Sequence, residues 1–121
     1  MSASTIAGIS VATVAGELPA PVVFGDWIMK TREYVVVRVT LNSGIEGWAF
    51  TLTRDGAVAE QIRKTLKNIY LGTNAEDVEK TYTIALRRSL ASHSAGLGLR
   101  ALSILDLATW DARANQSNQS I

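Results

Sequence analysis

The sequence predicts an α+β fold in which a three-stranded antiparallel meander is followed by a helical segment. Two observations predict it. Apolar residues recur with a period of two in the first half of the chain and with helical spacing in the second half. Turn-forming residues separate the segments. A length of 121 residues, with 47% hydrophobic and 19% charged residues, suits one soluble globular domain.

Three segments are expected to be extended or irregular in the first part of the chain. Thr5–Ala15 is rich in β-branched residues and lacks a helical period, so it is predicted to be a strand. Glu17–Thr31 contains both prolines and is longer than an ordinary hairpin loop, so it is predicted to be a long loop. Glu33–Leu41 alternates strictly and is the clearest strand, with one face formed by Val35, Val37 and Val39.

A β-hairpin is expected to follow directly. Asn42, Ser43 and Gly44 are turn formers, and Gly44 can adopt the positive φ that such a turn needs. Ile45–Leu52 then resumes as a third strand, with Trp48, Phe50 and Leu52 on one side. These strands complete the predicted meander.

The hydrophobic period changes after this hairpin, which predicts two amphipathic helices. The first runs from about Ala57 to Leu71, and Gly72 can take the left-handed position that ends it. The second is expected to begin near Asn74 and to fade at about Ser92. Thr73 and Glu76 have the spacing of a capping box at its start.

A third helical segment is apolar nearly all round. Gly96 and Gly98 are expected to break the chain before it, and the helix is expected to cover Leu99–Ala114. Three strands and two helices can cover only one face of such a helix. We therefore expect the segment around Trp110 to lie inside a larger body, with the chain ending before that body is complete.

Composition excludes several classes of function. The absence of cysteine excludes disulfides, thiolate metal sites and thiol nucleophiles, and a single histidine, His93, excludes a zinc site built from several imidazoles. His93 lies between serines without an acidic neighbour and is expected to be a solvated surface residue rather than a catalytic base. A net charge of +1 with scattered basic residues argues against nucleic acid as a partner.

Membrane insertion and export are not indicated either. No apolar stretch approaches the ~20 residues of a membrane span. The N-terminal segment has no Lys or Arg before Lys30, so it lacks the basic region of a signal peptide. A cytoplasmic location without membrane contact is expected.

Four stretches of the chain, in this order, resemble one protein family. They are Arg32–Val39, Gly44–Phe50, Leu71–Glu79 and Ala101–Asp111. Together they span nearly the whole chain and are similar to the N-terminal capping domain of the enolase superfamily, in the mandelate racemase and muconate lactonizing branch. The resemblance implies an enolase N-terminal domain-like fold, with residues 1–97 as the capping domain. Residues 98–121 would then be the first helix leading into a TIM-type barrel, which is absent from this chain, and a polar tail.

The resemblance also implies a division of labour. In this family a Mg²⁺ ion held by barrel carboxylates stabilises the enolate that forms when a proton α to a carboxylate is removed. The metal ligands and bases lie downstream of Trp110 and Asp111, so this chain is expected to hold no catalytic or metal-binding residue and to be inactive alone. Its expected partners are a C-terminal barrel domain, a carboxylic acid substrate and other copies in a homo-oligomer.

Two loops of the family's capping domain close over the barrel mouth, and here they correspond to about Glu17–Lys30 and Thr51–Gly56. Apolar side chains on such a lid select substrates and exclude water, whereas polar ones bind the substrate. The expected apolar wall includes Val22, Phe24 and Trp27, and the expected polar contacts are Thr51, Thr53 and Arg54. The aromatic loop has an alternative interpretation as an ordinary hydrophobic plug folded onto the sheet.

The sequence leaves two functions open. The first is the specificity domain of a racemase, cycloisomerase or acid-sugar dehydratase, that is, an isomerase or a lyase. The alternative is a self-contained α+β interaction module without catalytic activity, which buries its third helix against a partner or a second copy. Asp111 is expected to pair with Arg100, Arg113 or a barrel residue.

Overall fold

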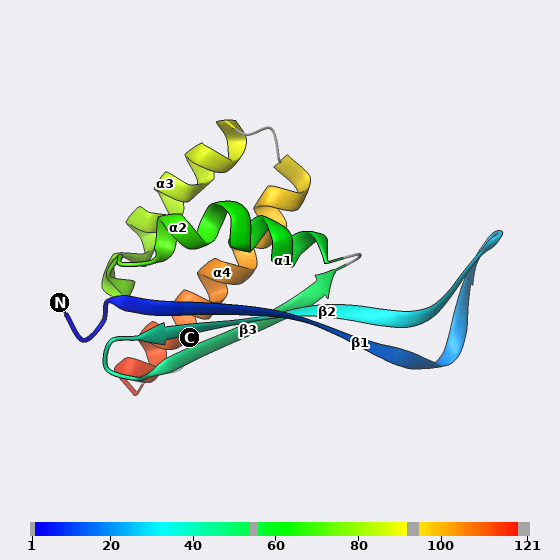
Figure 1. Cartoon of the computed structure of the whole chain (residues 1–121), viewed down its shortest axis with the longest axis horizontal. Helices are drawn as coiled ribbons and strands as arrows, with labels where there is room; N and C mark the ends of the chain where they lie inside the picture. Colours follow the sequence, from blue (N-terminus) through cyan, green and yellow to red (C-terminus); the bar gives the residue numbers. More distant parts are fainter. Residues whose placement is uncertain (1, 54–55, 92–94, 119–121) are drawn as a thin grey trace.

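Two long antiparallel strands form most of the sheet. They are β1 (Ile6–Phe24) and β2 (Trp27–Leu41), and β3 (Glu46–Thr53) pairs with the other side of β2. The strand order is β1-β2-β3, all antiparallel, and the helices lie over one face of this sheet (Figure 1). The predicted fold class, a three-stranded meander followed by helices, is confirmed.

The computed structural model describes residues 2–53, 56–91 and 95–118. Within these ranges, no helix combines the length and the apolar character required to cross a bilayer.

The predicted long loop at Glu17–Thr31 is wrong, because both strands continue through it as a β-ribbon. Phe24 pairs with Trp27 across a two-residue turn in which Gly25 has a φ of 59°. The register shifts between Glu17 and Val22, so residues 18–21 form an irregularity that contains both prolines. Proline is tolerated at bulges and strand edges, which is why the prolines do not end the strand here.

The two faces of the sheet differ in burial. One face is covered by the helices, and its β2 side chains Val35, Val37, Val39 and Leu41 are buried. The other face carries Trp48, Phe50 and Leu52, which are 52%, 69% and 46% exposed. Both faces of the alternating β2–β3 pair are therefore apolar, but only one has a partner within the described residues.

The first expected helix consists of three consecutive pieces. They are α1 (Ala57–Gln61), the π-helical η1 (Ile62–Leu66) and α2 (Lys67–Tyr70). The segment ends as predicted, because Gly72 follows with a φ of 83°, in the left-handed region that favours glycine.

The second helix begins with a different cap from the predicted one. A 3₁₀ turn, η2 (Ala75–Asp77), leads into α3 (Val78–Ala91), and the Asn74 side chain accepts a hydrogen bond from the Glu76 N–H at 2.9 Å. The predicted Thr73–Glu76 capping box is wrong, because the Thr73 hydroxyl donates to the Tyr70 carbonyl oxygen at 2.6 Å. An asparagine cap satisfies the same orphan amides one position later.

The last helix, α4 (Ala95–Gln116), is longer than expected. Gly96 and Gly98 lie inside it, so the predicted break at these glycines is wrong. Glycine in a helix costs only ~1 kcal/mol relative to alanine. Burial of residues such as Leu102 and Leu105, which are inaccessible to solvent on the face toward the sheet, offsets that cost.

A close approach joins α4 to β3. Gly47 is buried, and a Cβ atom at this position would collide with the backbone of Ala108 and Ala112. The Trp48 N–H donates to the Asp111 carboxylate at 2.8 Å, and the Asn115 side-chain amide donates to the Glu46 carbonyl oxygen at 2.8 Å. Asp111 therefore binds the backbone of a strand within this domain. The prediction that it pairs with Arg100 or Arg113 is wrong.

The outward face of α4 has no partner among the described residues. Leu97 is 39% exposed and Leu107 is 49% exposed, whereas Ala101, Ala108 and Ala112 on the opposite side are buried. The helix thus has two apolar faces. The sheet covers one of them, and no described residue covers the other.

Candidate functional site

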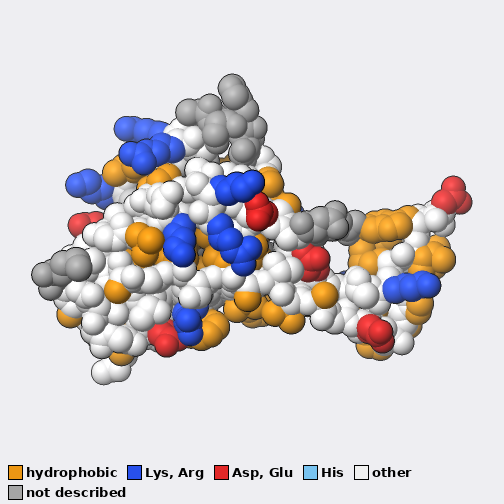
Figure 2. All heavy atoms as spheres, viewed as in Figure 1, with side chains coloured by type: hydrophobic (Ala, Val, Ile, Leu, Met, Phe, Trp, Pro, Cys, Tyr) orange, Lys and Arg blue, Asp and Glu red, His pale blue; other side chains and the backbone are white. Residues whose placement is uncertain are grey.

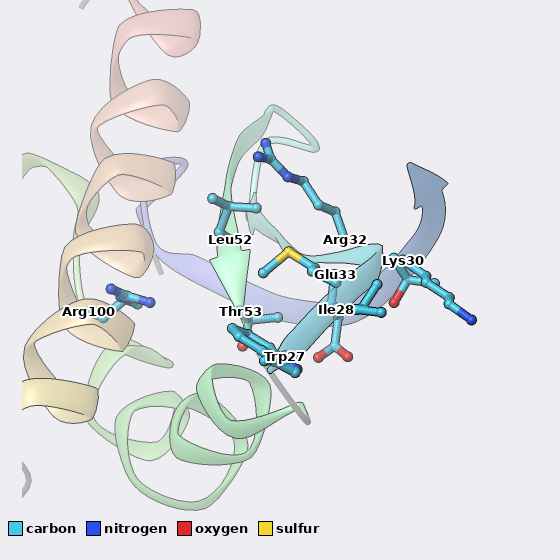
Figure 3. A pocket seen from close by; sticks show the side chains of 10 residues that line it. Trp27, Ile28, Lys30, Arg32, Glu33, Leu52, Thr53 and Arg100 are labelled. Carbon is cyan, nitrogen blue, oxygen red and sulfur yellow. The ribbon is translucent and has the colours of Figure 1, made fainter. Parts of the chain in front are cut away.

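A hollow lies between the ribbon, the end of β3 and α4. Its volume is about 640 Å³. Figure 3 shows the Arg100 side chain extending from α4 toward Leu52 and Thr53 at the end of β3, with Arg32 beside Leu52 on the neighbouring strand. The lining residues are Trp27, Ile28, Met29, Lys30, Thr31, Arg32, Glu33, Leu52, Thr53 and Arg100.

One wall of the hollow is an open sheet edge. β3 ends at Thr53, which pairs with Glu33, so β2 has no strand neighbour on that side from Trp27 to Arg32 within the described residues. An unpaired edge presents backbone N–H and C=O groups that bind polar ligands or another strand. The hollow therefore offers main-chain donors and acceptors as well as side chains.

The charge of the lining is mainly positive. Lys30, Arg32 and Arg100 contribute three cations, and Glu33 is the one acidic side chain in the described lining. The Glu33 carboxylate accepts a hydrogen bond from the Gly56 N–H at 2.7 Å, where it holds the start of α1. The arrangement attracts anionic groups.

The predicted apolar lid residues lie on the ribbon. Phe24 and Trp27 are 55% and 46% exposed, their rings stack with centroids 5.6 Å apart, and Val22 is half-buried nearby. The ribbon projects away from the body, and apolar side chains gather over it in Figure 2. This segment is therefore not folded onto the sheet as a hydrophobic plug.

The predicted polar lid residues have different surroundings. Thr53 is buried, and its hydroxyl accepts a hydrogen bond from the Val58 N–H at 3.4 Å, close to the start of α1. Thr51 is half-buried and lines a second hollow of about 320 Å³ between β3 and α4, which also includes Arg100 and Leu107. Arg54 and His93 lie outside the described residues.

Three cations of the hollow were missed by the sequence interpretation. Lys30 and Arg32 lie within or beside the segment that was predicted to be a loop. Both belong to β2, and the alternation of a strand would have placed them on one face. Arg100 is far away in sequence, and no local pattern connects it to the other two.

No metal centre forms within the part of the chain that the structure describes. Among those residues, no group of three or more His, Asp or Glu side chains is arranged to hold a metal ion. The residues in these described ranges therefore do not fit a resident Mg²⁺ ion.

A buried polar pair lies in the core, separate from the hollow. Burial and the nearby Asp106 carboxylate raise the pKa of the Tyr70 hydroxyl. Burial also raises the pKa of Asp106, and a hydrogen bond with the Trp110 side chain partly opposes this shift. The Tyr70 hydroxyl and Asp106 Oδ1 have no hydrogen-bond partner among the described residues, so this pair is a local cost to stability.

Comparisons with known proteins agree with this architecture. The family model described as "Mandelate racemase / muconate lactonizing enzyme, N-terminal domain" matches residues 6–121. A 3,6-anhydro-alpha-L-galactonate cycloisomerase from Streptomyces coelicolor is 31% identical over 88 residues, which cover 70% of this chain and 24% of that protein.

Solved structures match over nearly the whole chain. A racemase from Streptomyces coelicolor A3(2) with bound magnesium superposes with a TM-score of 0.85 and 26% identity, covering 93% of this chain and 32% of that one. The 3,6-anhydro-D-galactonate cycloisomerase from Zobellia galactanivorans has the same fold, with a TM-score of 0.78 and 24% identity over 94% of this chain and 29% of that one.

The chain thus spans about a quarter to a third of the length of these relatives. Those relatives are longer enzymes in which a further, C-terminal domain follows the matched region. The matched family model, the sheet order and the helices above it lead to one conclusion: this chain belongs to the mandelate racemase and muconate lactonizing enzyme family, as its N-terminal domain.

Proposed function

We propose that this domain is the cap of an enolase-superfamily enzyme and that it selects the substrate. The observation that carries the proposal is the ribbon, which extends beyond the body with exposed aromatic side chains beside a basic hollow. Exposed aromatic side chains at Phe24 and Trp27 do not stabilise an isolated domain. A lid that closes over a reaction centre buries such side chains.

The reaction itself belongs to the domain that follows. We infer that it is removal of a proton α to a carboxylate, with the enolate stabilised by Mg²⁺ in the C-terminal barrel. Two observations support this: the similar racemase was solved with bound magnesium, and the described residues of this chain offer no metal site. The names of the relatives, a racemase and cycloisomerases, favour an isomerase over a dehydratase.

The residues of this chain act on the substrate's surroundings. Val22, Phe24 and Trp27 would close the apolar side of the pocket and exclude water from it, which strengthens electrostatic interactions at the reaction centre. Thr51 and Arg54 would supply polar contacts. Thr53 is proposed to act indirectly, because its hydroxyl already bonds the start of α1.

The outward face of α4 is the surface we assign to the barrel domain. Leu107 on this face and Thr51 at the end of β3 line the same shallow hollow, and Arg100 connects that hollow with the larger one beside the ribbon. A domain seated there would cover the exposed leucines of α4 and would lie next to the lid.

The test uses an enzyme in which this domain precedes its barrel domain. Phe24→Ala and Trp27→Ala are expected to change the ratio of kcat/KM values between substrates by about tenfold, because each removes part of a pocket wall. The affinity for Mg²⁺ should stay unchanged. Ile84→Ala, which truncates a side chain that is 39% exposed on α3, is the matched control. Unchanged substrate ratios across a panel of carboxylic acids would refute the specificity role.

A further inference from the structure

Three arginines of the body hold the fold together. Arg113 pairs with Glu76 at 3.3 Å and stacks on Trp110, and Arg63 donates to the Val11 carbonyl oxygen at 2.7 Å. Arg38 donates to the Ser10 hydroxyl at 3.0 Å and lies over the Trp48 ring. These guanidinium groups have protein partners that explain their positions.

Arg32 and Arg100 differ from these three arginines, and their place at the hollow sets them apart from the exposed arginines of α3. Both are exposed, both line the hollow, and neither has an ion pair, hydrogen bond or ring contact with the described residues. The one described carboxylate of the hollow, Glu33, accepts a hydrogen bond from the Gly56 N–H and forms no ion pair with either arginine. The lining keeps an excess of positive charge, and this excess attracts an anion.

The surroundings of these arginines strengthen an interaction with an anion. Trp27, Met29 and Leu52 give the hollow apolar surface beside its cations, and apolar walls with a few charged groups are typical of small-molecule sites. A guanidinium also binds a carboxylate through two parallel N–H donors, which adds geometric selectivity to the charge.

The backbone of Arg100 is held more rigidly than that of Arg32. It lies on α4, which is held against β3 by the close contact at Gly47 and by the hydrogen bond from the Trp48 N–H to Asp111. Arg32 lies on β2 just beyond its last pair with β3, where the sheet narrows to two strands. A charge on a packed helix keeps its place when the ribbon moves.

We propose that the hollow is an anion site that binds a carboxylate of the substrate other than the reacting one, and that Arg100 is its specificity-determining residue. This inference rests on the proposed function, which places the reaction centre in the next domain. An anion held beside the ribbon therefore belongs to the distal end of the substrate. Substrates with a second carboxylate are favoured over acids with a neutral tail.

The experiment measures anion binding by the 121-residue chain itself, so that it does not depend on catalysis. Galactonate and galactitol are matched six-carbon polyols that differ in one carboxylate. The galactonate carboxylate stands in for the distal carboxylate of the substrate, because the reacting end is proposed to bind in the next domain. Each is titrated at constant ionic strength while the indole N–H resonances of the tryptophans are followed by NMR, because Trp27 lines the hollow. Galactonate is expected to shift the Trp27 resonance saturably, and galactitol is not.

Variants then assign the site. Arg100→Gln is expected to weaken galactonate binding roughly fivefold, in line with an exposed charge pair, while Arg100→Lys retains part of the affinity. Arg87→Gln removes an exposed arginine of α3 and is the control, which should bind like the parent chain. Far-UV circular dichroism checks that each variant is folded.

Three results would overturn the proposal: no saturable galactonate shift, equal binding of galactitol, or equal affinity in Arg100→Gln and Arg87→Gln. None of them would bear on the lid, because the ribbon variants are scored by substrate ratios in the longer enzyme. Conversely, ribbon variants without effect would refute the lid and leave the galactonate measurement intact.

Discussion

The two halves of β2 are parts of one strand in very different surroundings. From Val35 to Leu41 it lies between β1 and β3 and under the helices, and the side chains facing the helices are inaccessible to solvent. From Trp27 to Thr31 it has, among the described residues, β1 alone as a strand neighbour, and Ile28 is 52% exposed. The first half stabilises the fold, and the second is the part for which we propose a role in recognition.

This difference arises because β3 and the helices end before the ribbon begins. β3 stops opposite Glu33, and α1 starts a few residues later over the body of the sheet (Figure 1). A two-stranded ribbon is marginally stable by itself. Its pairing depends on continuity with the three-stranded part, so the body and the ribbon should respond differently to substitution.

The largest effect is expected at the helix–sheet contact of the body. Gly47→Val places a side chain where the backbone of Ala108 and Ala112 lies, so α4 must move away from β3. We expect a loss of at least ~4 kcal/mol in the free energy of unfolding, measured by urea denaturation. Gly16→Val is the control, because nothing lies within 4 Å of a Cβ at that position. Equal losses would show that the contact is not decisive.

A second comparison sets the buried body directly against the ribbon. Leu102→Ala empties a fully buried site on α4 and should cost about 3 kcal/mol. Ile28→Ala removes an aliphatic side chain that is 52% exposed on the ribbon and should cost less than about 0.5 kcal/mol. Thermal unfolding followed by circular dichroism measures both. A cost for Ile28→Ala close to that for Leu102→Ala would contradict the division of β2 into two roles.

The smallest effect concerns the buried polar pair of the body and depends on pH. Burial raises the pKa of Asp106 in the folded state, so the unfolded state loses this proton first as the pH rises. The stability cost is absent below the unfolded pKa of about 3.9 and is complete above the folded pKa. Asp106→Asn removes the titration but keeps an acceptor for Trp110.

Asp106→Asn should therefore match the parent chain near about pH 3 and exceed its Tm by about 2 °C at pH 7. Calorimetry over this pH range measures the difference. A gap that is constant with pH would mean that the Asp106 charge is not the cause. Asp26→Asn, at an exposed position in the turn of the ribbon, is the matched control and should show no such trend.

Much of the body could be predicted from local pattern. Strict alternation placed Val35, Val37 and Val39 on one buried face, and the glycines at 44 and 72 adopt the positive φ that their turns require. Alternation and turn chemistry act over a few residues, so they can be recognised without knowledge of the tertiary structure.

The errors came from residues whose effect depends on partners elsewhere. Pro19 and Pro21 favour a loop locally, but β2 continues beside them and turns the irregularity into a bulge. Gly96 and Gly98 favour a break, but the packed remainder of α4 carries the helix through them. In both cases contacts with other segments outweigh a local preference, which for a glycine in a helix is about 1 kcal/mol.

Some residues of the candidate site could be predicted from local sequence, and others could not. The aromatic residues of the ribbon were found because Phe24 and Trp27 stand out in a segment that contains both prolines. Arg100 was not found, because 67 residues separate it from Glu33 and only the packing of α4 against β3 brings it to the hollow.

The sequence by itself determined the class of the fold, the apolar faces of its strands and helices, and the resemblance of the whole chain to one family. Hydrophobic period and turn residues are local properties, and they carry this information without knowledge of the final packing. The tertiary structure alone decided that the ribbon projects, that α4 lies against Gly47, and that two arginines without a partner among the described residues line one hollow. Those features depend on contacts between segments far apart in the chain, which no local preference encodes.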